Sequence, residues 1–221
     1  TSSDVFFGGI GNARWGGVLL ADLLDRAGVQ PEATQVVGRS VDDWTAGFPT
    51  AVAFDGRPAL VALTMNGEPL PVQHGFPARM IVPGLYGYVS ATKWVVDIEL
   101  TTFEAFDPYW VQRGWAEQAP IKTMSRIDTP RPSAVVRTGT VPVAGVAWAQ
   151  HRGIERVELR VDGGPWMIAQ LAAEDTIDTW RQWVASWDAT PGDHQLQVRA
   201  TDLTGATQPE ARTHPFPNGA T

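Results

Sequence analysis

The sequence of 221 residues contains no cysteine. This absence excludes disulfide bonds, thiolate zinc or iron–sulfur sites and a cysteine nucleophile from the chain. Basic residues are also few, because 17 lysines and arginines stand against 24 aspartates and glutamates, for a net charge of −7. Binding a nucleic acid or an anionic membrane requires a basic face. The composition therefore argues against both partners and leaves room only for a local basic pocket.

Long hydrophobic runs are missing as well. No stretch approaches the ~18 apolar residues of a membrane span, and the N-terminus has no basic-then-apolar signal pattern. The sequence opens abruptly on the strand-like "DVFFGGI", which predicts a piece of a longer protein. Any membrane attachment is then expected through a segment outside this chain. With 43% apolar and 19% charged residues, the chain has the composition of one large or two ordinary globular domains.

The first half mixes helical and strand patterns. Apolar residues at helical spacing from Gly16 onward predict a helix that ends at a Gly28 C-cap. Strands are predicted at 34–40, 59–71, 78–84 and 92–103, the second of them with an Asn66–Gly67 hairpin turn. These elements predict an α+β unit. Residues 116–134 carry prolines and are predicted to form an extended connection.

The second half consists of short alternating runs. "VELRV" and "LQVRA" place apolar residues at every second position, as in half-buried strands. Asp162-Gly163-Gly164 and Pro191-Gly192-Asp193 have turn chemistry. About ninety residues of this kind predict an all-β immunoglobulin-like sandwich without the inter-sheet disulfide. The predicted domains are residues 1–126 and 127–221.

The segment "LPVQHGFPARMIVPGLYGYVSATKW" combines His74, Arg79 and Lys93 within twenty residues. Each residue has an ordinary structural interpretation: a histidine satisfied within a turn, an arginine in a surface ion pair, a lysine on a solvated strand. Together they suggest that an anion is held.

This segment, with "GNARWGGVLLADLLDRAG" and "MNGEPLP", closely resembles the later part of the molybdenum-cofactor domain of the sulfite oxidase family. "GVAWAQHRGIERVELRVDGGPW" resembles the family's C-terminal dimerisation domain. The resemblance covers nearly the whole chain in order and is closest to bacterial, actinobacterial members often found behind a membrane anchor. It implies a partial molybdopterin domain followed by the sandwich, in a homodimeric parent protein that is extracytoplasmic or membrane-anchored.

The resemblance also implies a cofactor site. His74 and Arg79 would clamp the terminal phosphate of a molybdopterin, and Lys93 would contact it. An arginine offers a planar fork for phosphate oxygens, and a lysine adds a point charge. Backbone N–H groups of a loop rich in small residues would add contacts; these belong to Ser90, Ala91 and Thr92.

One pterin contact departs from the family pattern. Ser40 aligns where the family tends to place an aspartate that contacts the pterin. Asp42 could take this role if the loop shifts.

Two further positions concern the substrate. The family's anion-binding arginine falls on Arg152, one residue further from "AW" than usual, although an exposed loop arginine is an equal alternative. The family's active-site tyrosine position falls on Trp115. An indole has one N–H donor and no titratable group, so sulfite itself is less secure as the small anionic substrate.

The family ligates molybdenum through an upstream cysteine, a soft ligand that suits the metal. With no cysteine, this chain is expected to supply no metal ligand and to be inactive alone, and whether it retains the cofactor is open. The first hypothesis is the C-terminal portion of a molybdopterin-dependent oxidoreductase, which transfers oxygen to or from a small oxyanion or an S-/N-oxide and has an unidentified electron partner. The alternative is a non-catalytic binding or assembly module, with a face formed by Trp148, Trp166, Trp180, Trp183 and Trp187.

Overall fold

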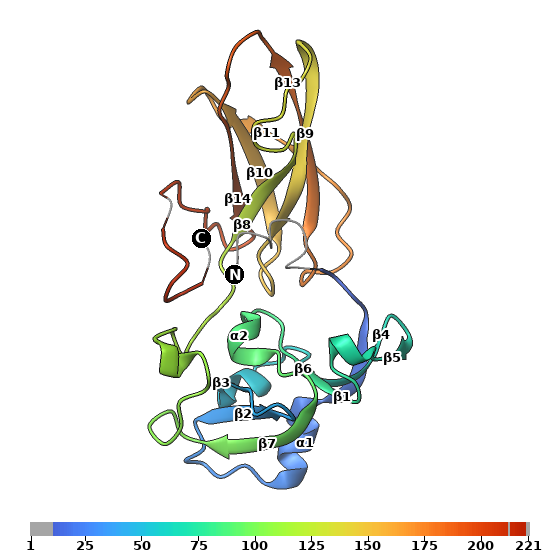
Figure 1. Ribbon diagram of the computed structural model, residues 1–221, viewed down its shortest axis with the longest axis vertical. Helices are drawn as coiled ribbons and strands as arrows, with labels where there is room; N and C mark the ends of the chain where they lie inside the picture. The colour runs from blue at the N-terminus through green and yellow to red at the C-terminus, as the bar shows by residue number, and fades with distance from the viewer. Residues whose placement is uncertain (1–10, 212, 220–221) are drawn as a thin grey trace. The chain divides into compact units, whose positions relative to one another are not determined.

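The computed structural model describes residues 11–211 and 213–219, which fall into two compact units (Figure 1). The N-terminal unit consists of Ala13–Ile121 joined by residues 214–219, and the Ig-like unit consists of Lys122–Thr213. The predicted boundary at residue 126 falls inside strand β8 (Met124–Thr129), which belongs to the Ig-like unit. The strand-like segment 4–10 lies outside the described residues.

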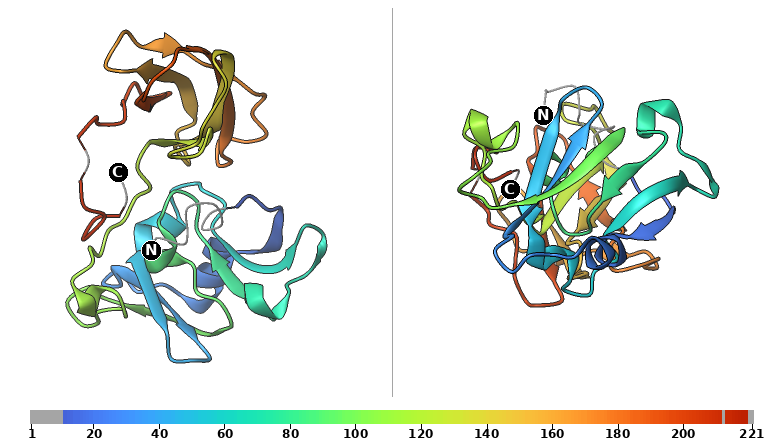
Figure 2. Two further views of the ribbon diagram at one scale, coloured as in Figure 1. Left: turned by 45° about the horizontal axis from the view of Figure 1, so that its top comes forward. Right: turned by 90° about the horizontal axis from the view of Figure 1, so that it is seen from below.

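The N-terminal unit contains two small antiparallel sheets. One has the order β1-β4-β5, with β6 also paired to β4, and the other has the order β3-β2-β7. The strands are β1 (Trp15–Leu19), β2 (Gln35–Ser40), β3 (Thr45–Pro49), β4 (Leu60–Met65), β5 (Glu68–Pro69), β6 (Arg79–Ile81) and β7 (Val95–Thr101). The β4–β5 hairpin projects from the unit (Figures 1 and 2) and turns at Asn66 and Gly67, both at positive φ as a tight hairpin requires.

Helices are few and short in this unit. They are α1 (Leu20–Ala27), η2 (Thr50–Ala53), η3 (Val72–His74), α2 (Gly87–Ser90) and η4 (Val111–Arg113). Helix α1 ends at a left-handed Gly28, as predicted. It begins only at Leu20, because Gly17 pairs with Ala62 in β4 so closely that a Cβ would lie 2.1 Å from the Val61 carbonyl oxygen. The unit is thus mostly β, and the α+β prediction is supported only in part.

Apolar side chains from both sheets and from α1 form the core of this unit. The largest fully buried ones include Phe48 from β3, Leu20 from α1 and Met80 from β6. Met80 also hydrogen-bonds through its amide to the Thr92 carbonyl at 2.8 Å. The core therefore fixes β6 against the segment that precedes β7, which is where the predicted phosphate residues lie.

The second unit is an all-β sandwich, as predicted. Its two antiparallel sheets have the orders β11-β10-β14 and β12-β13-β9-β8. The strands are β8, β9 (Gly139–Trp148), β10 (Ile154–Val161), β11 (Met167–Ile168), β12 (Gln170–Leu171), β13 (Arg181–Ala189) and β14 (Leu196–Asp202). The boundary between the units, at Ile121 and Lys122, falls inside the predicted connection at residues 116–134, but Met124–Thr129 of that segment form strand β8. Its proline-bearing sequence concealed a strand that pairs with β9.

The sandwich core includes Trp183 and Trp187, which are 2% and 9% exposed. Of the five tryptophans considered for a binding face, these two are therefore buried. The ring of Trp166 instead contacts two guanidinium groups, because the Cζ atoms of Arg160 and Arg199 lie 4.4 and 4.2 Å from its centroid. In the described residues, no helix is long and apolar enough to cross a membrane.

Candidate anion and cofactor site

The predicted phosphate residues meet around Gly75 in the N-terminal unit. Gly75 is buried with φ +108°, and a Cβ there would lie 3.1 Å from the Cβ atoms of both Arg79 and Lys93. The Arg79 guanidinium donates from Nη1 to the His74 carbonyl oxygen at 3.2 Å. The fold therefore brings His74, Arg79 and Lys93 together, and a glycine is required where their backbones converge.

Arg79 is held in a partly buried position. Its Cζ lies 4.8 Å from the ring centroid of Trp15, and its Nε is buried without a hydrogen-bond partner among the described residues. Burial lowers the pKa of Arg79 by desolvating the charge. An unsatisfied buried donor on a desolvated cation is costly, and an anion placed there would remove that cost.

Lys93 lies at the edge of this cluster. Its Nζ donates to the Gln73 carbonyl oxygen at 3.2 Å and lies 4.2 Å from the ring centroid of Trp94. Trp94 has φ +50° and anchors itself by donating from Nε1 to the Val72 carbonyl oxygen at 2.7 Å. Such a strained backbone needs support from its surroundings, and here it turns the lysine toward helix η3.

Ser40 lies beside the same cluster. It ends strand β2 opposite Val95, and the next residue, Val41, donates its amide to the Trp94 carbonyl oxygen at 3.1 Å. The pKa of Asp42 is lowered by interaction with the Ser40 hydroxyl and by the charge of Lys93. Within the part of the chain that the structure describes, the Ser40 hydroxyl nevertheless has no hydrogen bond of normal geometry. Both alternatives for the pterin contact, Ser40 and Asp42, thus lie near Lys93.

The small-residue loop follows helix α2. Ser90 is buried and donates its hydroxyl to the Tyr86 carbonyl oxygen at 3.0 Å, while Ala91 caps the helix. Thr92 is fully buried, and its hydroxyl lies 3.4 Å from the Gly38 carbonyl oxygen. The side chains of Ser90 and Thr92 therefore serve the local fold, which leaves backbone groups as the means by which this loop could contact a ligand.

Trp115 lies in an aromatic cluster that includes Tyr88 of helix α2. Its ring centroid is 5.1 Å from that of Tyr88, a residue of α2, and 6.1 Å from that of Trp110. The Tyr88 hydroxyl donates to the Ala116 carbonyl oxygen at 3.1 Å. Helix α2 thus joins the aromatic cluster to the loop of Ser90, Ala91 and Thr92.

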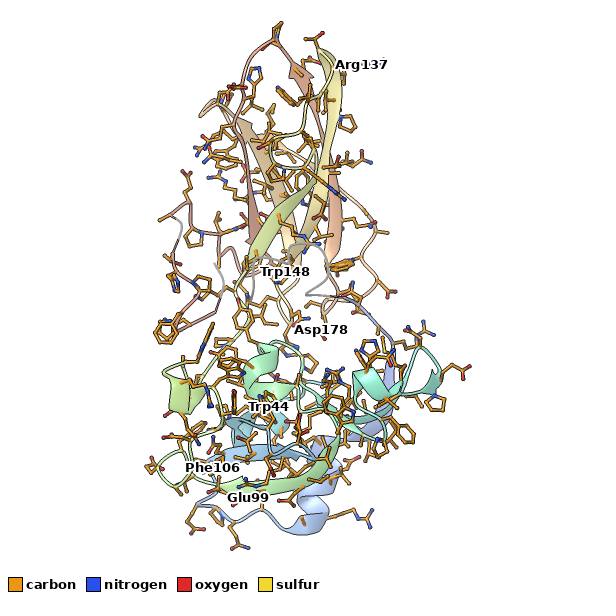
Figure 3. All side chains as sticks on the ribbon, in the orientation of Figure 1. Trp44, Glu99, Phe106, Arg137, Trp148 and Asp178 are labelled. Carbon is orange, nitrogen blue, oxygen red and sulfur yellow. The ribbon has the colours of Figure 1, made fainter. Side chains whose placement is uncertain are left out.

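Arg152 belongs to the Ig-like unit and is bound to Asp202. Its Nε donates to Asp202 Oδ2 at 2.9 Å, and its Nη2 donates to Thr123 Oγ1 at 3.1 Å. The neighbouring His151 donates its amide to Asp178 at 2.8 Å. Figure 3 shows Asp178 and Trp148 at the same end of this unit, with Arg137 at the opposite end. Arg152 therefore lies in a structured loop cluster rather than on a loose surface loop.

Two structural features, one in each unit, had no counterpart in the sequence patterns. One is Asp202, a fully buried carboxylate that ends the ordinary alternating strand β14. The other is the segment 214–219, which packs on the aromatic cluster. Neither carries a local motif. Among the described residues, no group of three or more histidine, aspartate or glutamate side chains is arranged to hold a metal ion.

Both units match models of known domain families. Residues 2–110 match the model of the oxidoreductase molybdopterin binding domain, and residues 125–198 match that of a bacterial Ig domain. A match to a molybdopterin-binding domain is thus followed by a match to an Ig-like domain. Sulfite oxidases are among the proteins to which the chain is similar over most of its length.

The relatives extend beyond this chain. Mitochondrial sulfite oxidase of Drosophila melanogaster is 33% identical, covering 94% of the chain and 43% of that protein. The Homo sapiens enzyme is 30% identical over 92% of the chain and 43% of its own length. The crystal structure of the sulfane dehydrogenase SoxCD from Paracoccus pantotrophus matches with a TM-score of 0.75 at 27% identity, covering 90% of this chain and 54% of that one. The chain thus spans about half the length of these relatives.

Proposed function

We propose that this chain is the later part of a molybdopterin-dependent oxidoreductase that transfers oxygen to or from a small oxyanion or an S- or N-oxide. In this proposal the N-terminal unit completes a mixed α+β cofactor domain together with a preceding segment, which supplies the cysteine ligand of molybdenum. The chain alone is then inactive. The lengths of the relatives, roughly twice that of this chain, support this view.

The observation that carries the proposal is the Arg79 side chain. Its buried, unsatisfied Nε and the convergence of Arg79 and Lys93 on Gly75 form a site that suits a phosphate group. A guanidinium can donate two parallel hydrogen bonds to phosphate oxygens. The residues present therefore fit the terminal phosphate of a molybdopterin, with His74 beside it and the backbone of Ser90, Ala91 and Thr92 and the Ser40 region as further contacts.

The bound molybdenum-molybdopterin would supply the two-electron chemistry, and the protein would supply orientation and charge. Arg79 and Lys93 would hold the cofactor in place by neutralising its phosphate. Arg152 would bind the substrate oxyanion. Trp115 would offer an N–H donor without a titratable proton, which favours a substrate other than sulfite.

The parent protein is further proposed to be a homodimer that associates through the Ig-like unit and passes electrons to a separate partner. A two-fold interface would use the same face of each sandwich. An extracytoplasmic or membrane-anchored location and a bacterial, actinobacterial source belong to the same proposal.

The experiment is molybdenum analysis of the full-length protein that contains this chain, together with an assay of oxygen transfer to an artificial electron acceptor. The proposal predicts about one molybdenum per chain, because the family binds a single cofactor. It also predicts turnover of at least one small oxyanion or S- or N-oxide. A full-length protein that folds but contains no molybdenum would exclude it.

The alternative of a tryptophan-rich binding module has less support. Trp183 and Trp187 are core residues, and Trp166 is covered by two arginines. They cannot form one exposed aromatic face.

A further inference from the structure

Asp202 uses its two carboxylate oxygens for two different tasks. Oδ1 accepts hydrogen bonds from the Thr204 amide, the Thr204 hydroxyl and the Ala206 amide, at 3.0, 2.6 and 3.1 Å. Oδ2 accepts from Thr123 Oγ1 at 2.5 Å and from Arg152 Nε at 2.9 Å. One oxygen thus closes the turn after β14, and the other holds Arg152.

The pair is asymmetric in its exposure to solvent. The Asp202 side chain is fully buried, whereas that of Arg152 is 29% exposed. Burial alone would raise the pKa of Asp202, but hydrogen bonds from Thr123, Thr204 and Arg152 lower it well below its usual value, so the carboxylate stays ionised. A buried, permanently charged acceptor fixes the guanidinium more firmly than a surface carboxylate could.

The surrounding backbone reinforces this arrangement. The Ala149 carbonyl oxygen accepts from the amides of Arg152 and Gly153 at 2.9 and 2.8 Å, which defines the loop that carries Arg152. The Leu203 amide donates to the Gly153 carbonyl oxygen at 3.2 Å. A Cβ on Gly153 would lie 2.8 Å from a Leu203 methyl carbon, so the loop and the turn of Asp202 are closely packed.

We propose that Asp202 is a positioning residue: through Oδ2 it holds the Arg152 guanidinium in the orientation in which Arg152 binds the oxyanion substrate. The inference rests on the proposed function, in which Arg152 contacts the substrate. Thr123 also helps to position Arg152, because its hydroxyl donates to Asp202 and accepts from Arg152 Nη2.

The division between the oxygens provides a matched pair of variants. Asp202→Asn keeps an oxygen for the turn but replaces Oδ2 with an NH₂ group, which cannot accept from Arg152. Thr204→Ala weakens the turn and leaves the contacts of Oδ2 intact. A purely structural role predicts comparable effects of both variants on melting temperature and on anion binding.

Two readouts test positioning. In the 221-residue chain, the Arg152 Nε–H resonance, assigned by its loss in Arg152→Lys, is followed by NMR during titration with sodium sulfate. In the full-length protein, KM and kcat are measured for the best oxyanion substrate. We expect Asp202→Asn to raise the sulfate Kd and KM by about tenfold or more, because the variant loses one charge-assisted hydrogen bond. Its kcat should change less, because the lost contact binds substrate and transition state alike.

Thr204→Ala should leave the sulfate Kd and KM within about twofold of wild type, because it removes one hydrogen bond to Oδ1 and leaves both contacts of Oδ2 in place. A wild-type sulfate affinity and KM in Asp202→Asn would overturn the inference. If Asp202→Asn does not fold, the sulfate Kd and KM are measured in Thr123→Val instead, because this variant removes the hydroxyl that joins Asp202 to Arg152. An Arg152 resonance that does not shift on addition of sulfate to the wild-type chain also overturns the inference. A full-length protein without molybdenum refutes the proposed function instead.

Discussion

Trp115 packs edge to face against Phe216, with the ring centroids 5.6 Å apart and the ring planes at 84°. The Ala116 amide donates to the Pro217 carbonyl oxygen at 3.0 Å, directly beside this contact. Gly219, buried at φ +87°, lies so close to the Tyr86 ring that a Cβ would be 2.4 Å from it. Residues 214–219 are therefore an integral part of the N-terminal unit, although they follow the sandwich in the sequence.

Replacing Phe216 with alanine should lower the free energy of unfolding of the N-terminal unit by about 1–2 kcal/mol, from lost aromatic contact and partial burial. Urea denaturation of the chain measures the change. Phe54→Ala is the control, because Phe54 is equally exposed, at 43%, and belongs to the same unit. Equal losses in the two variants would show that the contact with Trp115 contributes nothing specific.

The identity of residue 115 should influence the choice of substrate. Trp115→Tyr introduces a hydroxyl that can donate a hydrogen bond and exchange a proton, so it should increase kcat/KM for sulfite in the full-length protein. Steady-state kinetics, with molybdenum content measured in parallel, tests this expectation. No gain at unchanged molybdenum content would mean that Trp115 has been assigned the wrong role.

His194 should make the stability of the Ig-like unit depend on pH. Its Nδ1 lies 2.6 Å from Asp162 Oδ2 and its Nε2 lies 3.0 Å from the Thr190 carbonyl oxygen. The hydrogen bond with Asp162 raises the pKa of His194, with help from Thr190 and the charge of Asp193, and the same bond lowers the pKa of Asp162. Protonated His194 therefore stabilises the folded unit. This stabilisation is complete below the unfolded-state pKa of about 6.5 and is lost as pH rises through the higher folded-state pKa.

The melting temperature of the Ig-like unit should therefore decline above about pH 6.5. Thermal unfolding followed by circular dichroism between pH 5 and pH 9, a range chosen around that value, measures the slope. His194→Gln and Asp162→Asn should each flatten it. A wild-type slope in both variants would assign the pH dependence to other groups.

Dimerisation through the Ig-like unit can be measured without the cofactor. If the sandwich carries the interface, the 221-residue chain should sediment as a dimer at micromolar concentration, since about 800 Å² per partner is enough for a stable interface. Sedimentation equilibrium gives the mass. A monomer at every concentration would place the interface elsewhere or remove it from the proposal.

Local patterns in the sequence predicted most elements of the fold. Alternating residues located β10 and β14, and Gly28 correctly marked the end of α1. The start of α1 was missed because Val18 and Leu19 fit a helical pattern, yet they pair with β4 in a sheet. Strand β8 was missed because its pairing with β9 is a tertiary contact that overrides the extended, proline-bearing context.

The candidate site was predictable only where its residues are close in the sequence. His74, Arg79 and Lys93 lie in one segment, and the fold brings them together. Arg152 and Asp202 lie far apart in the sequence of the Ig-like unit. Trp115 precedes that unit in the sequence and Phe216 follows it. No periodicity or spacing encodes such contacts. The roles of the site residues in cofactor and substrate binding stay predictions.

Arg79 is proposed to bind the phosphate of a molybdopterin. The most direct test of this role is the molybdenum content of the full-length protein carrying Arg79→Ala, measured by elemental analysis of folded material. Arg57→Ala is the control, because Arg57 is a partly buried arginine of the same unit that already binds Asp55. We predict that Arg79→Ala loses most of its molybdenum, Lys93→Ala loses less, and Arg57→Ala retains it. Full molybdenum occupancy in a folded Arg79→Ala protein would show that Arg79 does not hold the cofactor.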